Sequence, residues 1–208
     1  MWKQICWLIL GGIVFFSMAS LLWAEDEYAV TNPNYDAYIT AHPLETKPRD
    51  AKVVEAEKQL CVEAAQAVVD YAKANGVEQA AAEVTKGVND AFAKYNIGPQ
   101  FRIAILQFTN KGPQGEAGDF MIAKGHSLFT NMIGVTVLLD MFADISGWKY
   151  LFEYRKAAFS PPGKGWVNNP IWPDEFWAGN KIVRYLVYNQ AIDREQGLMV
   201  MTCTILDE

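Results

Sequence analysis

The period of the hydrophobic residues changes once, near residue 100, and this change restricts the fold more than any other feature of the sequence. Before it, apolar side chains recur every three or four residues from Asp50 to the Asn75-Gly76 pair, which is typical of an amphipathic helix of about 25 residues. A shorter helix is expected over residues 77–95. After it, the period is two, as in β-strands. Helices followed by a run of strands predict an α+β fold.

Five segments beyond residue 100 have the composition of strands, and we expect them to form one antiparallel sheet behind the long helix. They are residues 101–108, 120–126, 165–169, 180–192 and 198–206. Small helices are expected between the second and third strands, at residues 135–143 and 148–159. Pro170 directly follows the third strand, where a proline predicts a sheet edge or a bulge.

The N-terminal segment, residues 1–24, favours export. Residues 5–24 are uncharged and mostly apolar, and Lys3 is the only charge before Glu25. A cleaved signal peptide and a retained membrane anchor both stay open. Either places the following chain on the outer side of the membrane, so we expect a periplasmic protein, anchored to the inner membrane if the segment is retained. Residues 25–49 contain three prolines and predict an extended arm or linker before a single domain over residues 50–208.

Composition and cysteine content limit the chemistry. The net charge is -6, the pI is about 5.0, and no basic run exceeds two residues, which argues against a nucleic-acid partner. Outside the N-terminal segment the cysteines are Cys61 and Cys203, and both a disulfide and two unrelated buried thiols stay open. The sequence has no nucleophile elbow, phosphate loop or zinc motif, so we expect no catalysis, no cofactor and no metal.

Several landmarks follow one another in the order found in single Cache domains, the PAS-like extracellular sensor modules of bacterial receptors. They are the Asn110–Gly112 turn, His126 eight residues before Gly134, the segment LLDMFADISGWKYLFE (residues 138–153), and GKGWV followed by Trp172-Pro173 and by Tyr185 on the next strand. The sequence resembles this family over about residues 50–206. The resemblance implies a PAS-like sheet, a long N-terminal helix, and a pocket for a short carboxylate or an amino acid.

The stretch WVNNPIWPDEFW, residues 166–177, carries three tryptophans, and by the resemblance its Trp-Pro step covers the pocket. The candidate ligand-binding residues are Trp172, Tyr185, His126, Lys181 and Arg184. Because neighbours on a strand point to opposite faces, Tyr185 is favoured over Arg184 as a pocket residue.

Purely structural alternatives stay open for the same residues. Trp166 and Trp172 would then cap the core, Arg184 would pair with Asp174 or Glu175, and His126 would be a hydrogen-bonded residue at a strand end. The closing strand reads TCT where the family favours Gly-x-Gly, so Thr202 and Thr204 are expected to add bulk beside the pocket.

Two functions are compatible with these observations. The first is an exported domain that binds a small organic solute, with no signalling output of its own because the sequence stops at Glu208, after the last strand. The second is a non-enzymatic accessory subunit of a membrane complex, with a filled pocket and with the arm docked on a membrane-protein partner. The resemblance also implies a homodimer through the long helix, and residues 5–24 would contact the membrane if uncleaved.

Overall fold

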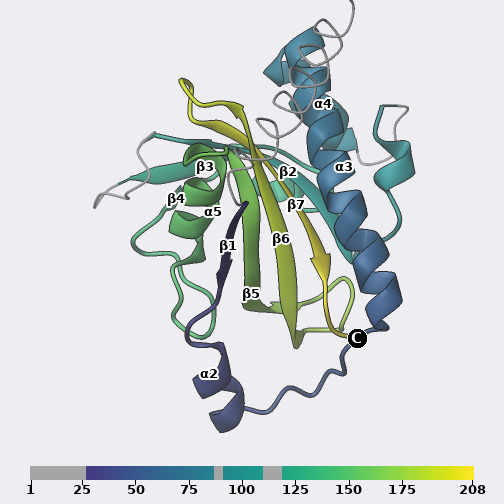
Figure 1. Cartoon of the computed structure of the whole chain (residues 1–208), viewed down its shortest axis with the longest axis vertical. Coiled ribbons are helices and arrows are strands. Elements are labelled where there is room, and N and C mark those ends of the chain that lie inside the picture. Colours follow the sequence, from purple (N-terminus) through teal and green to yellow (C-terminus); the bar gives the residue numbers. More distant parts are fainter. Residues whose placement is uncertain (1–26, 87–90, 110–118) are drawn as a thin grey trace, which may run out of the picture.

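A seven-stranded mixed sheet with strand order β1-β5-β6-β7-β2-β3-β4 organises the protein (Figure 1). The structure is a computed structural model that describes residues 27–86, 91–109 and 119–208. Its elements are β1 Tyr28–Thr31, α2 Tyr35–Ala41, α3 Ala51–Asn75, α4 Val77–Lys86, η1 Ala93–Tyr95, β2 Phe101–Phe108, β3 Phe120–His126, η2 Thr130–Met132, β4 Thr136–Leu138, α5 Tyr150–Phe159, β5 Lys164–Asp174, β6 Lys181–Asp193 and β7 Leu198–Ile205.

The long helix α3 begins and ends where its sequence signals predict. The Asp50 carboxylate accepts hydrogen bonds from the backbone N–H groups of Lys52 and Val53, at 2.8 and 3.2 Å. Gly76 follows the last turn with φ +90°, a conformation that favours glycine. The Asp50 cap and the Gly76 stop therefore define α3, and the 25-residue prediction is confirmed.

The sheet contains the five predicted strands and two more. The strands β5, β6, β7, β2 and β3 pair antiparallel. The edge strand β1 pairs parallel with β5, and β4 extends β3 at the other edge, so the prediction of a purely antiparallel five-stranded sheet is wrong in both respects. Pro170 lies in the predicted bulge, where the register shifts between Asn168 and Ile171. Asn169 has φ 60° there, which asparagine tolerates better than most residues.

The predicted helix over residues 135–143 is wrong. Residues 136–138 form β4 instead, and they pair antiparallel with residues 120–122 of β3. The β-branched side chains of Val135, Thr136 and Val137 lose rotamer freedom in a helix and favour an extended backbone. The helix predicted over residues 148–159 is present as α5.

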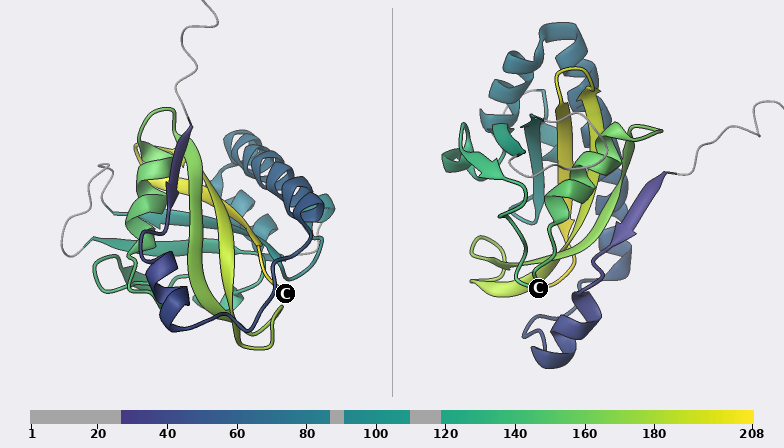
Figure 2. Two further views of the ribbon diagram at one scale, coloured as in Figure 1. Left: turned by 60° about the horizontal axis from the view of Figure 1, so that its bottom comes forward. Right: turned by 90° about the vertical axis from the view of Figure 1, so that its left-hand side faces the viewer.

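The two faces of the sheet pack against different helices (Figure 2). Residues of β2 alternate between them: Ile103 and Ile105 pack in the cluster formed with α3 and α4, whereas Ala104 and Leu106 pack in the cluster formed with α5. We call these the α3 face and the α5 face. The alternation assigns the residues of a strand to the two faces, except where a bulge interrupts it, as between Asn168 and Ile171 in β5.

Within the segment expected to form an extended arm or linker, residues 27–49 contain β1 and α2 and contact the domain. Figure 1 shows this arm running from β1 through α2 and past the lower end of the sheet to the start of α3, near the C-terminus. Its last residues pair with the end of the chain: Lys47 and Glu208 exchange backbone hydrogen bonds of 2.9 and 2.8 Å, and Pro48 forms a bridge with Asp207.

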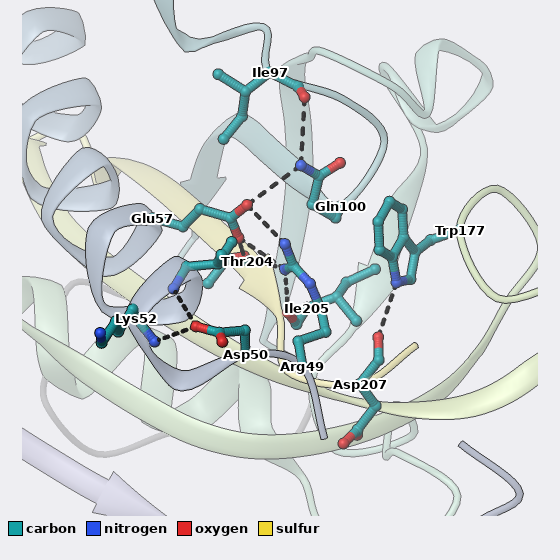
Figure 3. Close-up of polar contacts among 11 residues, drawn as sticks. Arg49, Asp50, Lys52, Glu57, Ile97, Gln100, Trp177, Thr204, Ile205 and Asp207 are labelled. Atoms are coloured by element: carbon teal, nitrogen blue, oxygen red, sulfur yellow. Dashed lines mark hydrogen bonds and ion pairs between the residues drawn. The ribbon is translucent and has the colours of Figure 1, made fainter. Parts of the chain in front are cut away.

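A buried ion pair fixes the junction between the arm and α3 (Figure 3). Arg49 binds the Glu57 carboxylate through two parallel hydrogen bonds of 2.8 Å, and both side chains are 6% exposed. Thr204 and Gln100 also donate to this carboxylate. Although burial opposes ionisation, the hydrogen bonds from Arg49, Thr204 and Gln100 hold the pKa of Glu57 below its ordinary value. The pair therefore stays charged near neutral pH.

A glycine allows the close approach of β1 to β5. A Cβ atom at Gly165 would lie 2.3 Å from the backbone oxygen of Tyr28. We expect Gly165→Ala to displace β1, to lower stability by about 1–3 kcal/mol, and to raise amide hydrogen exchange in residues 28–32. Gly125→Ala is the matched control, because its Cβ would meet the backbone of Ala81 in α4 instead. Equal amide hydrogen exchange in β1 of the wild type and of Gly165→Ala would contradict the claim that Gly165 allows this close approach.

No helix within the described ranges is both long enough and apolar enough to cross a bilayer. Residues 1–24, with their alternatives of signal peptide and anchor, lie outside those ranges, as does the Asn110–Gly112 turn.

Candidate functional site

A pocket of about 310 Å³ opens on the α5 face of the sheet. Its floor consists of side chains from β2, β3, β6 and β7, and its other walls come from α5, the segment between β3 and α5, and the second half of β5. The lining residues are Arg102, Leu106, Met121, Ala123, His126, Phe129, Met132, Val137, Phe142, Tyr150, Leu151, Tyr154, Pro170, Trp172, Pro173, Tyr185, Val187, Met201 and Cys203.

One end of the pocket is aromatic. Trp172 stacks on Phe142 with ring centroids 5.4 Å apart, and Tyr150 presents its edge to both rings, at 6.1 and 5.9 Å. Tyr154 extends the group, 5.0 Å from Tyr150. These rings provide a flat, apolar wall of the kind that binds small organic molecules.

The other end holds a buried polar group around Arg102. Its Nη2 donates to Asp174, Nη1 donates to the Tyr185 hydroxyl at 3.3 Å, and Nε donates to the Pro99 carbonyl at 3.1 Å. The Tyr185 hydroxyl in turn donates to Asp174 at 2.7 Å. Burial opposes ionisation of Asp174, but the hydrogen bonds from Tyr185 and Arg102 outweigh it and lower the pKa of this carboxyl. Arg102 and Asp174 therefore form a charged pair beside the pocket.

His126, the last residue of β3, also lines the pocket. Its Nδ1 accepts hydrogen bonds from the backbone N–H groups of Leu128 and Phe129, both at 3.0 Å. This arrangement leaves the ring proton on Nε2. Burial, with a smaller contribution from the Arg102 charge, lowers the pKa of His126 to about 4. The imidazole is therefore neutral at physiological pH.

This low pKa predicts an acid-dependent loss of stability. Between pH 6.5 and 4 the unfolded chain binds a proton at His126 that the folded protein does not bind, so stability falls as the pH falls through this window. The loss approaches about 3 kcal/mol at the acid end. An NMR titration should give a pKa of about 4 for this residue. His126→Gln, which keeps an acceptor for the two N–H groups, should remove this part of the pH dependence; an unchanged profile in the variant would contradict the assignment.

Three of the five candidate residues line the pocket, and two do not. Trp172, Tyr185 and His126 line it, although their contact with a ligand stays a prediction. Arg184 lies away from the pocket and pairs with Asp207, with Nε–O distances of 2.9 and 3.0 Å, rather than with Asp174 or Glu175. Lys181 is exposed at the start of β6.

The expectation that Thr202 and Thr204 add bulk beside the pocket is wrong. Thr202 donates to the Cys61 carbonyl of α3 at 2.9 Å, and Thr204 donates to Glu57, so both point to the α3 face. The pocket residues of β7 are Met201 and Cys203. Side chains of β7 alternate between the two faces of the sheet, and its threonines point to the face opposite the pocket.

Cys61 and Cys203 are free, buried thiols, so of the two alternatives the disulfide is not formed. Cys61 packs in the cluster on the α3 face and Cys203 in the cluster on the α5 face. The sheet thus separates the two side chains. Burial raises the pKa of Cys203 to about 11, which leaves it as a thiol in the pocket wall.

The three tryptophans of residues 166–177 have three different surroundings. Trp166 packs on Tyr188 in the cluster of the α3 face, and its Nε1–H donates to Glu27 at 3.1 Å. Trp172 lines the pocket. Trp177 donates to the Asp207 carbonyl at 2.8 Å and lies under Arg49 (Figure 3). Trp166 therefore caps the core, Trp172 forms part of the pocket wall, and Trp177 binds the residues that follow β7.

Asp144 fixes the segment that leads into α5. Its Oδ1 accepts from the backbone N–H groups of Ser146 and Trp148, at 2.9 and 3.1 Å, and from the Ser146 hydroxyl at 2.6 Å. Its Oδ2 accepts from the Asn32 side chain and the Ile171 backbone N–H, both at 3.0 Å. Asp144 is 4% exposed. One carboxylate thus joins the arm, β5 and the segment before α5, next to the aromatic end of the pocket.

Arg102, its partner Asp174 and the aromatic residues that surround Trp172 were not predicted as pocket residues from the sequence. A signal was available for Arg102, because a permanent cation in the mostly apolar run FRIAILQF requires a buried counter-ion. Within the described ranges, no group of three or more His, Cys, Asp or Glu side chains is placed to hold a metal ion.

Fold and pocket together define an α+β domain with a solute-sized pocket on the sheet face opposite its long helix. No family model matches the chain, and no curated protein matches it. A solved structure described as "Periplasmic sensor domain of chemotaxis protein" is similar, with a TM-score of 0.49 and 15% sequence identity over 76% of this chain and 97% of that chain.

Proposed function

We propose that this protein is an exported, sensor-type domain of the periplasm that binds a small organic solute in the pocket on the α5 face. The observation that carries the proposal is the pocket of about 310 Å³, with its aromatic wall and a single polar end. Pockets that are mostly apolar, with a few placed polar groups, are the usual binding sites for small molecules. Export is supported by the apolar segment 5–24 of the sequence.

The proposed role is binding without catalysis. Near neutral pH, burial keeps His126 unprotonated and Cys203 as a thiol, so the pocket offers neither an imidazolium acid nor a thiolate nucleophile. Burial also raises the pKa of Tyr150 well above its ordinary value. These groups suit hydrogen bonding and packing better than proton transfer.

The accessory-subunit alternative is less well supported. It assumes a pocket filled by side chains, whereas this pocket is open. It also assumes a free arm, whereas residues 47–49 pair with residues 206–208. A homodimer through α3 and membrane contact by residues 5–24 are further proposals, and neither depends on the pocket.

Binding in this pocket is expected to depend on Trp172. We expect some members of a panel of short carboxylates, amino acids and uncharged aromatic compounds to raise the melting temperature, because a ligand at 100 Kd adds about 2.7 kcal/mol. Trp172→Ala should weaken binding at least tenfold by calorimetry. Trp166 lies on the same strand but packs on the α3 face, so Trp166→Ala should leave the Kd unchanged. The proposal would be contradicted if no compound of the panel binds, or if Trp172→Ala and Trp166→Ala weaken binding equally.

A further inference from the structure

The net charge of the groups around the pocket is zero, and this restricts what the pocket can accept. Of the described residues that line it, Arg102 alone carries a permanent charge. The side chains of Arg102 and its partner Asp174 are 4% and 1% exposed, so the two charges cancel within the protein and not through solvent. The remaining polar groups of the wall, including His126 and Tyr185, are neutral near pH 7.

Arg102 is also enclosed by its neighbours. Its guanidinium lies over the rings of Phe129 and Tyr185, at 4.9 and 5.4 Å from their centroids. Three of its five N–H groups are taken by Asp174, the Tyr185 hydroxyl and the Pro99 carbonyl, which leaves two. The unused N–H groups, one on Nη1 and one on Nη2, can donate to a ligand oxygen, but the positive charge of the guanidinium is already balanced by Asp174.

Asp174 has no unused oxygen for a ligand ammonium group. Its Oδ2 accepts from Arg102 and Tyr185, and its Oδ1 accepts from the backbone N–H groups of Phe176 and Trp177, at 3.1 and 2.7 Å. Asp174 is also absent from the residues that line the pocket. The ammonium group of an amino acid would therefore enter the pocket without a counter-ion, and burying an unpaired charge is costly.

We propose that the pocket selects an uncharged, flat organic solute, such as an aromatic amide, over the matching carboxylate, and that Asp174 sets this selectivity by neutralising Arg102. The inference rests on the proposed function and narrows its ligand class. The ring of the solute lies against Trp172 and Tyr150, and its oxygen accepts a spare N–H of Arg102. Asp174 acts through Arg102 and is a positioning residue.

The first test compares isosteres that differ in charge. Benzamide with benzoate, and 2-naphthamide with 2-naphthoate, have nearly the same shape. We expect each amide to bind the wild-type protein at least tenfold more tightly than its acid at pH 7, by calorimetry, with the binding lost in Trp172→Ala. Tighter binding of the acids overturns the inference and leaves the proposed function standing. If no amide, acid, amino acid or short carboxylate binds, both are overturned.

The second test changes the counter-ion. Asp174→Asn keeps the size of the side chain but leaves Arg102 unneutralised, so the acids should gain at least tenfold in affinity while the amides change little. The double variant Arg102→Gln/Asp174→Asn has no charge at this site, and it should retain the preference for amides. The role of Asp174 is overturned if the double variant binds the acids more tightly than the wild type does. It is also overturned if Asp174→Asn folds and its affinity for the acids does not rise. If Asp174→Asn does not fold, the affinities of the wild-type protein and of the double variant for the amides and the acids still test the inference.

Discussion

Replacing Glu57 with alanine is expected to lower the free energy of unfolding by about 3–5 kcal/mol, because it leaves the Arg49 guanidinium buried without a counter-ion. Arg49 would keep its hydrogen bond of 2.7 Å to the Ile205 carbonyl and its position over Trp177, but neither contact carries a negative charge. Gln100 and Thr204 would each lose an acceptor as well. Urea denaturation at pH 7 measures the change.

Two variants separate the charge effect from general damage to α3. Glu55→Ala removes an exposed carboxylate on the same helix, 3.9 Å from Lys58, and should cost less than about 1 kcal/mol. The double variant Arg49→Met/Glu57→Leu removes both charges and should recover much of the loss. A Glu57→Ala protein as stable as Glu55→Ala would show that the pair does not hold the arm to α3.

Replacing Asp144 with alanine is expected to cost a similar amount, about 3–5 kcal/mol, since it removes five hydrogen bonds, three of them buried. The effect should also be local. Amide exchange should rise at Trp148 and Ile171, whose N–H groups the carboxylate accepts, and the aromatic end of the pocket should loosen. Denaturation and exchange measured on one sample test both expectations.

Asp193 offers a matched control for Asp144. It accepts from the backbone N–H groups of Glu195 and Gln196, and from the Gln196 side chain, but at an exposed turn. Water can replace this carboxylate, so Asp193→Ala should cost less than about 1 kcal/mol. Equal losses in the two variants would mean that burial of the Asp144 hydrogen bonds contributes nothing beyond local turn formation.

Local signals predicted the regular part of the fold well. The bounds of α3, β2 and β3 agree with the sequence, because a capping aspartate, a terminal glycine and long apolar periods act over a few residues. The short strands β1 and β4 were missed for the same reason, since they contain four and three residues and depend on partners far away in the chain.

The pocket could be predicted only in part. Alternation along β6 correctly separated Tyr185 from Arg184. Which face carries the pocket depends on the register between β7 and β2, where Cys203 lies opposite Arg102 and Thr202 opposite Ile103. The pairing of Arg102 with Asp174 joins residues 72 positions apart, and a single sequence does not specify such a contact.

The parallel pairing of β1 with β5 has a mechanical consequence. The chain ahead of Tyr28 connects to α3 only through β1 and the arm, and β1 is paired with β5 from Tyr28 to Thr31. Tension applied from that side, along the strand axis, would load the β1–β5 hydrogen bonds in shear, so that several must break together before any force reaches Arg49. β1 would thereby shield the pocket-bearing sheet and its long helix from pulling on the N-terminal segment.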